Sequence, residues 1–201
     1  METIKKNQKK KWKQLPYALI YLRLLIGVYF ILASITGPLQ NPLTISVLLT
    51  GGIFTDIFDG IIARKLKCDT VHLRQLDSKV DTVFWFSLLY VLLVMRNRFI
   101  IDHAIELFIL LALEIGVQLF GYFKFNSSLA LHTYAAKGWA VLLTLTVLQL
   151  LLGSETEILF YCMFIWGLIT QTEVLIIVFK MKTFKIDIRS VFHLFSEPQK
   201  S

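Results

Sequence analysis

Charged residues and cysteines are scarce in this sequence, and each shortage excludes a class of protein. Only 17% of the 201 residues are charged, whereas 56% are apolar and the mean hydropathy is +0.65. A soluble domain of this composition would have to expose much of its hydrocarbon to water, which argues against a soluble globule. The two cysteines, Cys68 and Cys162, suggest neither a disulfide framework nor redox chemistry.

Long apolar segments fill most of the chain. A helix needs about 20 apolar residues to cross the hydrocarbon core of a bilayer, and apolar segments cover residues 16–35, 43–63, 77–95, 99–120, 139–152 and 158–179. The sequence therefore predicts an all-α, polytopic membrane bundle of six transmembrane helices. In this prediction residues 16–180 form one transmembrane catalytic domain, and residues 1–15 and 181–201 are cytoplasmic tails.

The positive charges are placed asymmetrically along the chain. Six of the 21 basic residues are the lysines between Lys5 and Lys13, directly before the first span. Further basic residues follow the second, fourth and sixth spans, whereas the loops around Leu39 and Glu155 carry none. The exception is the short turn after the third span, where Arg96 and Arg98 are outweighed by the other basic residues. Because cytoplasmic loops are enriched in lysine and arginine, we expect both termini in the cytoplasm. The net charge of +7 then fits an anionic lipid surface, and no nucleic-acid partner is expected.

Acidic residues are few, and the aspartates among them are concentrated in one segment. Five of the seven aspartates lie between Asp56 and Asp81. Asp56 and Asp59 are three residues apart near the end of the second span, and Asp77 and Asp81 are four apart at the start of the third. Residues at these separations share a helix face, so each pair points in one direction. A charged side chain at membrane depth is costly unless it has a partner or a task, which marks a candidate site.

These four carboxylates converge if the second and third spans fold as an antiparallel hairpin, and their mutual repulsion then requires cations. Two divalent ions would balance four negative charges. Ligation by oxygen alone, with no histidine or thiolate nearby, favours Mg²⁺ or Mn²⁺. A pair of such ions is the usual arrangement for in-line attack at phosphorus.

A stripe of small and basic residues continues the acidic face of the second span. Gly60, Ala63 and Arg64 follow Asp56 at positions on one side of a helix. The two small residues leave room for a ligand near the backbone, and the Arg64 guanidinium offers a planar fork of donors suited to phosphate. We therefore expect this side of the helix to face a phosphate-bearing ligand.

The whole stretch resembles the CDP-alcohol phosphatidyltransferase family, whose motif is D-x2-D-G-x2-A-R-x8-G-x3-D-x3-D. The second glycine of the motif is replaced by Leu73. The resemblance implies six spans, with the motif bridging the second and third. It also implies transfer of a phosphatidyl group from CDP-diacylglycerol or a similar CDP-linked lipid to a small alcohol, with release of CMP. Seven of the eight fixed positions are kept at every spacing, by Asp56, Asp59, Gly60, Ala63, Arg64, Asp77 and Asp81.

A role for each motif position follows from the resemblance. It assigns Asp56, Asp59 and Asp77 to two metal ions, Mg²⁺ or Mn²⁺. It assigns Asp81 to one metal and to deprotonation of the acceptor hydroxyl. The positions that border the cytidine diphosphate are matched by Asp56, Gly60, Ala63 and Arg64.

Two basic residues outside the motif are candidates for contacts with phosphate or with the acceptor. Relatives often carry an arginine in the first span, where this chain has Arg23, and a lysine near the start of the fifth, where it has Lys137. Arg23 could equally neutralise a carboxylate, and Lys137 could equally be a basic flank of its helix.

Several alternatives stay open at this point. A cation transporter also uses intramembrane carboxylates, a membrane prenyltransferase also uses aspartate clusters, and Leu73 could mark a catalytically impaired family member. In the fourth span, Glu106, Glu114 and Gln118 share one side of the helix. They could line the acceptor side of a cavity, pack against another span or form the contact of a homodimer.

Overall fold

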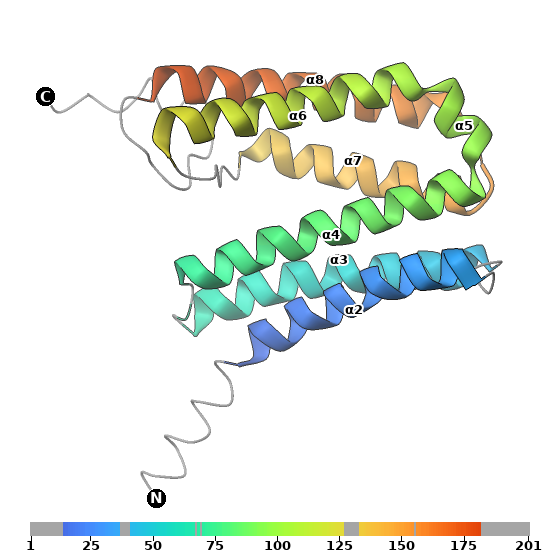
Figure 1. Cartoon of the computed structure of the whole chain (residues 1–201), viewed down its shortest axis with the longest axis horizontal. Helices are drawn as coiled ribbons and strands as arrows, with labels where there is room; N and C mark the ends of the chain where they lie inside the picture. Colours follow the sequence, from blue (N-terminus) through green and yellow to red (C-terminus); the bar gives the residue numbers. More distant parts are fainter. Residues whose placement is uncertain are drawn as a thin grey trace, which may run out of the picture. The chain divides into compact units, whose positions relative to one another are not determined.

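The secondary structure of the chain is helical throughout the part that the structure describes. The computed structural model describes residues 14–36, 41–66, 68, 70–126, 133–154 and 156–181, and these ranges contain seven helices and no strand (Figure 1). The all-α prediction is confirmed. The helices are α2 (Leu15–Thr36), α3 (Pro42–Lys65), α4 (Val71–Met95), α5 (Asn97–Asp102), α6 (Ala104–Phe125), α7 (Tyr134–Leu151) and α8 (Glu157–Lys180).

Six of these helices are long and apolar enough to cross a membrane. They are α2, α3, α4, α6, α7 and α8, with 18 to 24 residues in each candidate span. Their exposed side chains are largely aliphatic and aromatic, as a lipid-facing surface requires. The prediction of six spans is therefore confirmed, and the chain is a multi-pass membrane protein. The predicted tails lie almost wholly outside the described residues.

Three helix boundaries differ from the predicted ones. The helix α4 begins at Val71, six residues before the predicted start, because the Thr70 hydroxyl accepts a hydrogen bond from the Leu73 amide at 3.2 Å and caps the helix. Similarly, Thr133 caps α7, which begins at Tyr134. Each first turn contains one basic residue, Arg74 in α4 and Lys137 in α7, which interrupts the apolar segment from which the start was predicted. The predicted fourth span is divided at His103 into the short α5 and the long α6.

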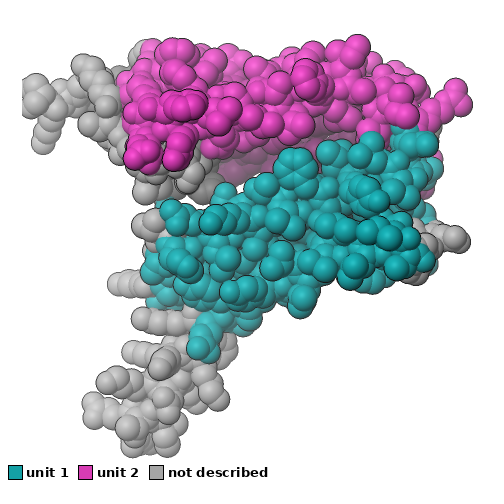
Figure 2. Space-filling model, in the orientation of Figure 1, with its two compact units in different colours: residues 1–97 teal, residues 98–201 magenta. Residues whose placement is uncertain are grey.

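The chain divides into two compact units, Met1–Asn97 and Arg98–Ser201 (Figure 2). In the first unit, α2 packs against both α3 and α4. Two glycines, one in α2 and one in α3, make room for Phe84 of α4. A methyl group on Gly27 would lie 3.4 Å from the Phe84 Cα, and one on Gly52 would lie 2.5 Å from the Phe84 ring. The Phe84 side chain of α4 is fully buried and also packs against Phe30 of α2.

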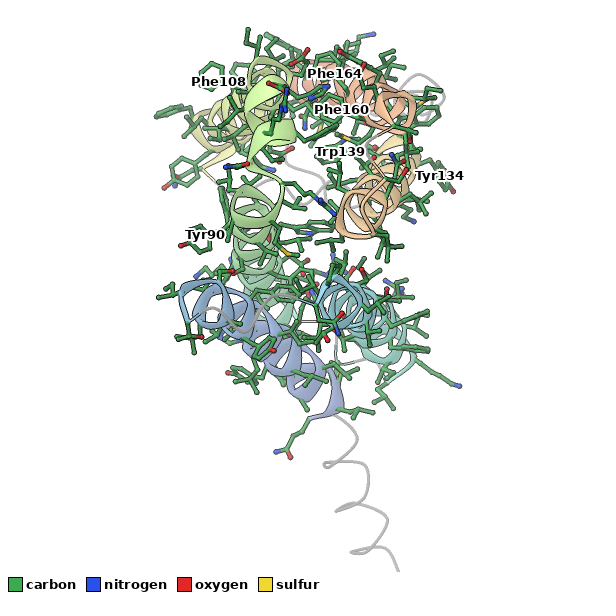
Figure 3. All side chains as sticks on the ribbon, turned by 90° about the vertical axis from the view of Figure 1, so that its right-hand side faces the viewer. Tyr90, Phe108, Tyr134, Trp139, Phe160 and Phe164 are labelled. Carbon is green, nitrogen blue, oxygen red and sulfur yellow. The ribbon has the colours of Figure 1, made fainter. Side chains whose placement is uncertain are left out.

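The second unit is held together by two reciprocal tryptophan–glycine contacts between α7 and α8. The Trp139 ring of α7 covers Gly167, where a methyl group would lie 2.8 Å from its Nε1. The Trp166 ring of α8 covers Gly138, and its Nε1 donates to the Ala135 carbonyl at 3.0 Å. Trp139 is one of the side chains labelled in Figure 3. Each glycine therefore gives the facing indole room to lie against a helix backbone.

Polar side chains of the second unit pair between α6 and α8. Gln171 of α8 donates a hydrogen bond to Glu114 of α6, and Gln118 donates to the same carboxylate at 3.2 Å. For Glu114, the sequence left open a cavity lining, packing against another span or a homodimer contact. The structure supports packing against another span, because Glu114 accepts from Gln171 of α8. Lys124, near the end of α6, donates to the carbonyls of Val178 and Phe179 at 2.7 and 2.9 Å.

Candidate functional site

The four motif aspartates meet in one half of the first unit. This half is formed by the first half of α2, the second half of α3 and the first half of α4 (Figure 1). Asp56 and Asp59 come from α3, and Asp77 and Asp81 from α4. The predicted convergence of the two pairs is therefore present. The helix that brings them together is α2, which packs against both of the others.

Arg23 of α2 lies at the centre of the four carboxylates. Its Nη1 is 3.0 Å from Asp56 Oδ1 and donates to Asp77 Oδ1 at 3.0 Å and to Asp81 Oδ1. Its Nη2 donates to Asp59 Oδ2. Only 1% of the Arg23 side chain is exposed. The sequence left two roles open for this residue, and the structure shows the neutralising one.

The cluster is closed on one side and open on the other. Asp59 is buried, with 4% of its side chain exposed. Asp77 and Asp81 are about one-third exposed, and Asp56 is 48% exposed. Arg23 therefore reaches the carboxylates from the buried side, whereas a ligand would reach them from the side of Asp56.

The spacing of three of the carboxylates fits a metal ion. One oxygen atom each from Asp56, Asp59 and Asp77 can be chosen so that all three lie within 4.8 Å of one another. Aspartate oxygens at such separations, with no nitrogen or sulfur ligand among them, suit a hard divalent cation. Asp81 is not part of this group of three, but its carboxylate contacts the same Arg23 guanidinium as the other three aspartates. The donor set therefore fits the predicted Mg²⁺ or Mn²⁺, with Asp81 at the edge.

One turn further along α3, Gly60 and Arg64 form an exposed corner. The Arg64 side chain is exposed and folds back over Gly60, so that a methyl group on Gly60 would lie 3.5 Å from Arg64 Nη1. This is an ordinary van der Waals separation, and the guanidinium is the mobile end of a long side chain. Gly60 and Arg64 are therefore both accessible to a ligand, as the phosphate prediction requires.

Ala63 and Leu73 lie in an apolar cluster rather than on an open surface. Both are buried, at 5% and 4% exposure, and they pack with Ile20 and Val80. Leu73 and Val80 pack in one cluster with Ile20 of α2, and the aspartates of α4 contact Arg23, about one turn further along the same helix. The side chain that replaces the second motif glycine therefore fills the space between α2, α3 and α4.

Leu73→Gly should consequently lower stability rather than raise activity. Loss of a buried leucine side chain costs about 2–5 kcal/mol, and glycine in a helix adds up to about 1 kcal/mol. We expect a lower melting temperature in detergent for Leu73→Gly, and little change for the control Leu93→Ala, whose side chain is 42% exposed on the same helix. Higher enzymatic turnover at an unchanged melting temperature would contradict this prediction and indicate that Leu73 lies beside a bound ligand.

The remaining candidate, Lys137, belongs to the second unit. It lies on the first turn of α7, is exposed, and has its Nζ 5.6 Å from the centre of the Tyr134 ring. Its contact with an acceptor stays a prediction.

The sequence reasoning missed the contribution of Gly27 and Gly52 to the site. Gly27 lies four residues after Arg23, and Gly52 lies four residues before Asp56, so each glycine shares a helix face with a charged site residue. This spacing is the signal in the sequence that could have identified the two glycines.

Comparison with known proteins agrees with the motif. The family model described as CDP-alcohol phosphatidyltransferase matches residues 13–181, which include α2 to α8 and all the candidate site residues. No curated protein and no solved structure gives a significant match.

Proposed function

The chain belongs to the CDP-alcohol phosphatidyltransferase family, and from this premise we propose that it makes a phospholipid from CDP-diacylglycerol or a similar CDP-linked lipid. A hydroxyl oxygen of a small alcohol forms a bond to the phosphatidyl phosphorus, the bond from this phosphorus to the bridging oxygen breaks, and CMP leaves with that oxygen. The observation that carries the proposal is the meeting of Asp56, Asp59, Asp77 and Asp81 around Arg23 between α2, α3 and α4.

Three of these carboxylates are proposed to hold divalent ions. Asp56, Asp59 and Asp77 have oxygen atoms close enough for a shared cation, and two ions, Mg²⁺ or Mn²⁺, would balance the charge of the whole cluster. Such ions, when bound, supply neutralisation of the diphosphate and of the departing oxygen. The protein itself then has to position the reactants, because phosphoryl transfer needs little covalent help.

The other side chains position the reactants and accept the proton. Asp81, one-third exposed and at the edge of the cluster, accepts the proton of the acceptor hydroxyl. Arg64, which is exposed beside Gly60, donates to the diphosphate of the donor lipid. A site within the membrane also limits water, which would otherwise hydrolyse the activated lipid.

The distribution of charge favours this proposal over a cation transporter. In the first unit, the described acidic side chains all lie in the second half of α3 and the first half of α4. A transporter needs polar groups along a path from one membrane face to the other. The aspartate cluster is instead arranged to serve a ligand that arrives from one face.

The test of the proposal is release of CMP. Purified full-length protein is incubated in detergent with labelled CDP-diacylglycerol, Mn²⁺ and a panel of alcohols, and CMP and the lipid product are measured. We expect CMP together with a new phospholipid for at least one acceptor, and neither product when EDTA replaces Mn²⁺. No CMP with any acceptor would refute the proposed activity and favour an impaired family member.

The active site is proposed to face the cytoplasm, in line with the positions of the basic residues. Cysteines introduced at Leu39 and Ser154 should react with an impermeant thiol reagent added outside intact cells. A cysteine introduced at Thr70, next to the site, should react only after the membrane is opened. The natural Cys68 and Cys162 are first replaced by serine as background control. The opposite labelling pattern would place the aspartates on the outer face.

Gly60→Ala tests whether the donor lipid approaches the backbone of α3. The added methyl group meets nothing closer than 3.5 Å, so the variant should fold normally. A ligand that lies against Gly60 would be displaced, and displacement by about 1 Å can lower turnover up to about a hundredfold. We therefore expect a large loss of kcat/KM for the donor.

The matched control for this variant is Gly51→Ala. Gly51 lies on the same helix and has no neighbouring atom within 4 Å of an added methyl group. Both substitutions gain the same helix propensity, so only the position relative to the ligand differs. Equal kinetics for Gly60→Ala and Gly51→Ala would mean that the donor does not contact Gly60.

A further inference from the structure

Arg23 contacts the same three aspartates whose spacing fits a divalent ion. Its Nη1 lies 3.0 Å from Asp56 Oδ1 and 3.0 Å from Asp77 Oδ1, and these two residues belong to the group of three that can share an ion. Its Nη2 contacts Asp59, the third member of that group. One guanidinium therefore contacts every carboxylate that fits a metal ion.

We propose that Arg23 is a built-in counter-ion that holds the carboxylates together without metal and that competes with divalent ions for them. The proposal rests on the metal-binding part of the proposed function, and it adds that arginine and metal occupy the cluster in turn. Arg23 is thus a positioning residue that acts through the aspartates.

The free energy cost of burying the carboxylates without a cation supports this role. Asp59 is buried, and all four aspartates lie in helices that cross the membrane. Removing the partner of a buried charge is strongly destabilising, because the remaining charge is neither solvated nor paired. Since Arg23 contacts all four carboxylates, its guanidinium is the cation that lets α2, α3 and α4 meet before any ion is bound.

The balance of charge indicates why Arg23 does not replace the metal. Four carboxylates and one guanidinium leave three negative charges in excess, so the cluster continues to attract cations. An ion that binds the same oxygens at about 2.0–2.6 Å repels a guanidinium nitrogen within 3.0 Å of them. Arg23 therefore has to withdraw from part of the cluster when metal binds.

The surroundings of Arg23 allow this withdrawal. Its Nε is buried and has no hydrogen-bond partner, so the guanidinium is not fixed from the side of α2.

The test measures binding of Mn²⁺ and thermal unfolding, without substrate. Full-length wild type, Arg23→Gln and the control Arg98→Gln are purified in detergent. Arg98 is 94% exposed and lies outside the first unit. We expect Arg23→Gln to bind Mn²⁺ at least about tenfold more tightly than wild type in titrations followed by the electron paramagnetic resonance of free Mn²⁺. In EDTA its melting temperature should fall by several degrees, and saturating Mn²⁺ should recover that loss. Arg98→Gln should match wild type in both measurements.

The experiment also tests the proposal if Arg23→Gln does not fold in the absence of metal. Arg23→Gln is then purified with Mn²⁺ and treated with EDTA, and unfolding of this variant alone supports the proposal. Arg23→Lys keeps the charge and should bind Mn²⁺ with an affinity between those of wild type and Arg23→Gln. Unchanged or weaker Mn²⁺ binding by folded Arg23→Gln would overturn the competition. No Mn²⁺ binding by any of the proteins would refute the proposed metal site as well, whereas failure of CMP release alone would refute only the proposed activity.

Discussion

Asp56→Asn should lower CMP release by at least about a hundredfold while the protein remains folded. Asp56 is the most exposed of the four aspartates and belongs to the group of three that fits a metal ion. A bound ion contributes several kcal/mol to stabilising charge in the transition state, and each 1.36 kcal/mol corresponds to a factor of ten in rate. Turnover at saturating donor and acceptor is the measurement, with melting temperature as the check on folding.

The matched control is Asp102→Asn. Asp102 is 62% exposed in the second unit, and its carboxylate lies 4.0 Å from Arg98 Nε. Its loss should leave turnover within a factor of two. Partial recovery of Asp56→Asn at high Mg²⁺ would agree with a weakened metal site. Full activity of Asp56→Asn at ordinary metal concentrations would refute the assignment of Asp56 to the metal.

Asp81→Asn should separate proton transfer from metal binding. Asp81 lies one turn beyond Asp77 on α4 and outside the group of three metal-binding candidates. Loss of a positioned general base lowers turnover by about 10²- to 10⁴-fold. We expect such a loss in kcat, with the affinity for the CDP-linked lipid and for Mn²⁺ kept within a few-fold of wild type.

Asp77→Asn is the comparison on the same helix, because it removes a carboxylate from the group of three. It should weaken Mn²⁺ binding as well as turnover. If Asp81→Asn weakened Mn²⁺ binding as strongly as Asp77→Asn, Asp81 would act as a metal ligand first. If Asp81→Asn turned over at nearly the wild-type rate, the hydroxyl would need no base from the protein.

The aspartates were predictable because their spacing is tied to a regular helix. Three- and four-residue separations fix a common face, and one hairpin is enough to bring Asp56 and Asp77 near each other. The six spans were predictable for a similar reason, since the thickness of the bilayer sets the length of an apolar segment. Both features depend on local periodicity, which a single sequence contains.

The place of Arg23 was not predictable in the same way. Its neighbours depend on how α2 packs against α3 and α4, and that packing depends on space left by Gly27 and Gly52 around Phe84. The direction of Leu73 was also uncertain, because it is separated from Asp77 by one turn and could share its face. Only the positions of Ile20 and Val80 show that Leu73 packs into the interior.

The glycines of the membrane helices indicate how the protein can be stabilised for experimental structure determination. Replacing glycine by alanine in a helix gains up to about 1 kcal/mol. Gly51 and Gly116 have open space around them and accept this change. An added methyl group would collide with the Phe84 ring at Gly52, and with Leu110 and Trp139 at Gly167, each within 2.8 Å. Thermostabilising libraries should therefore vary the first pair and keep the second, although all four glycines look alike in the sequence.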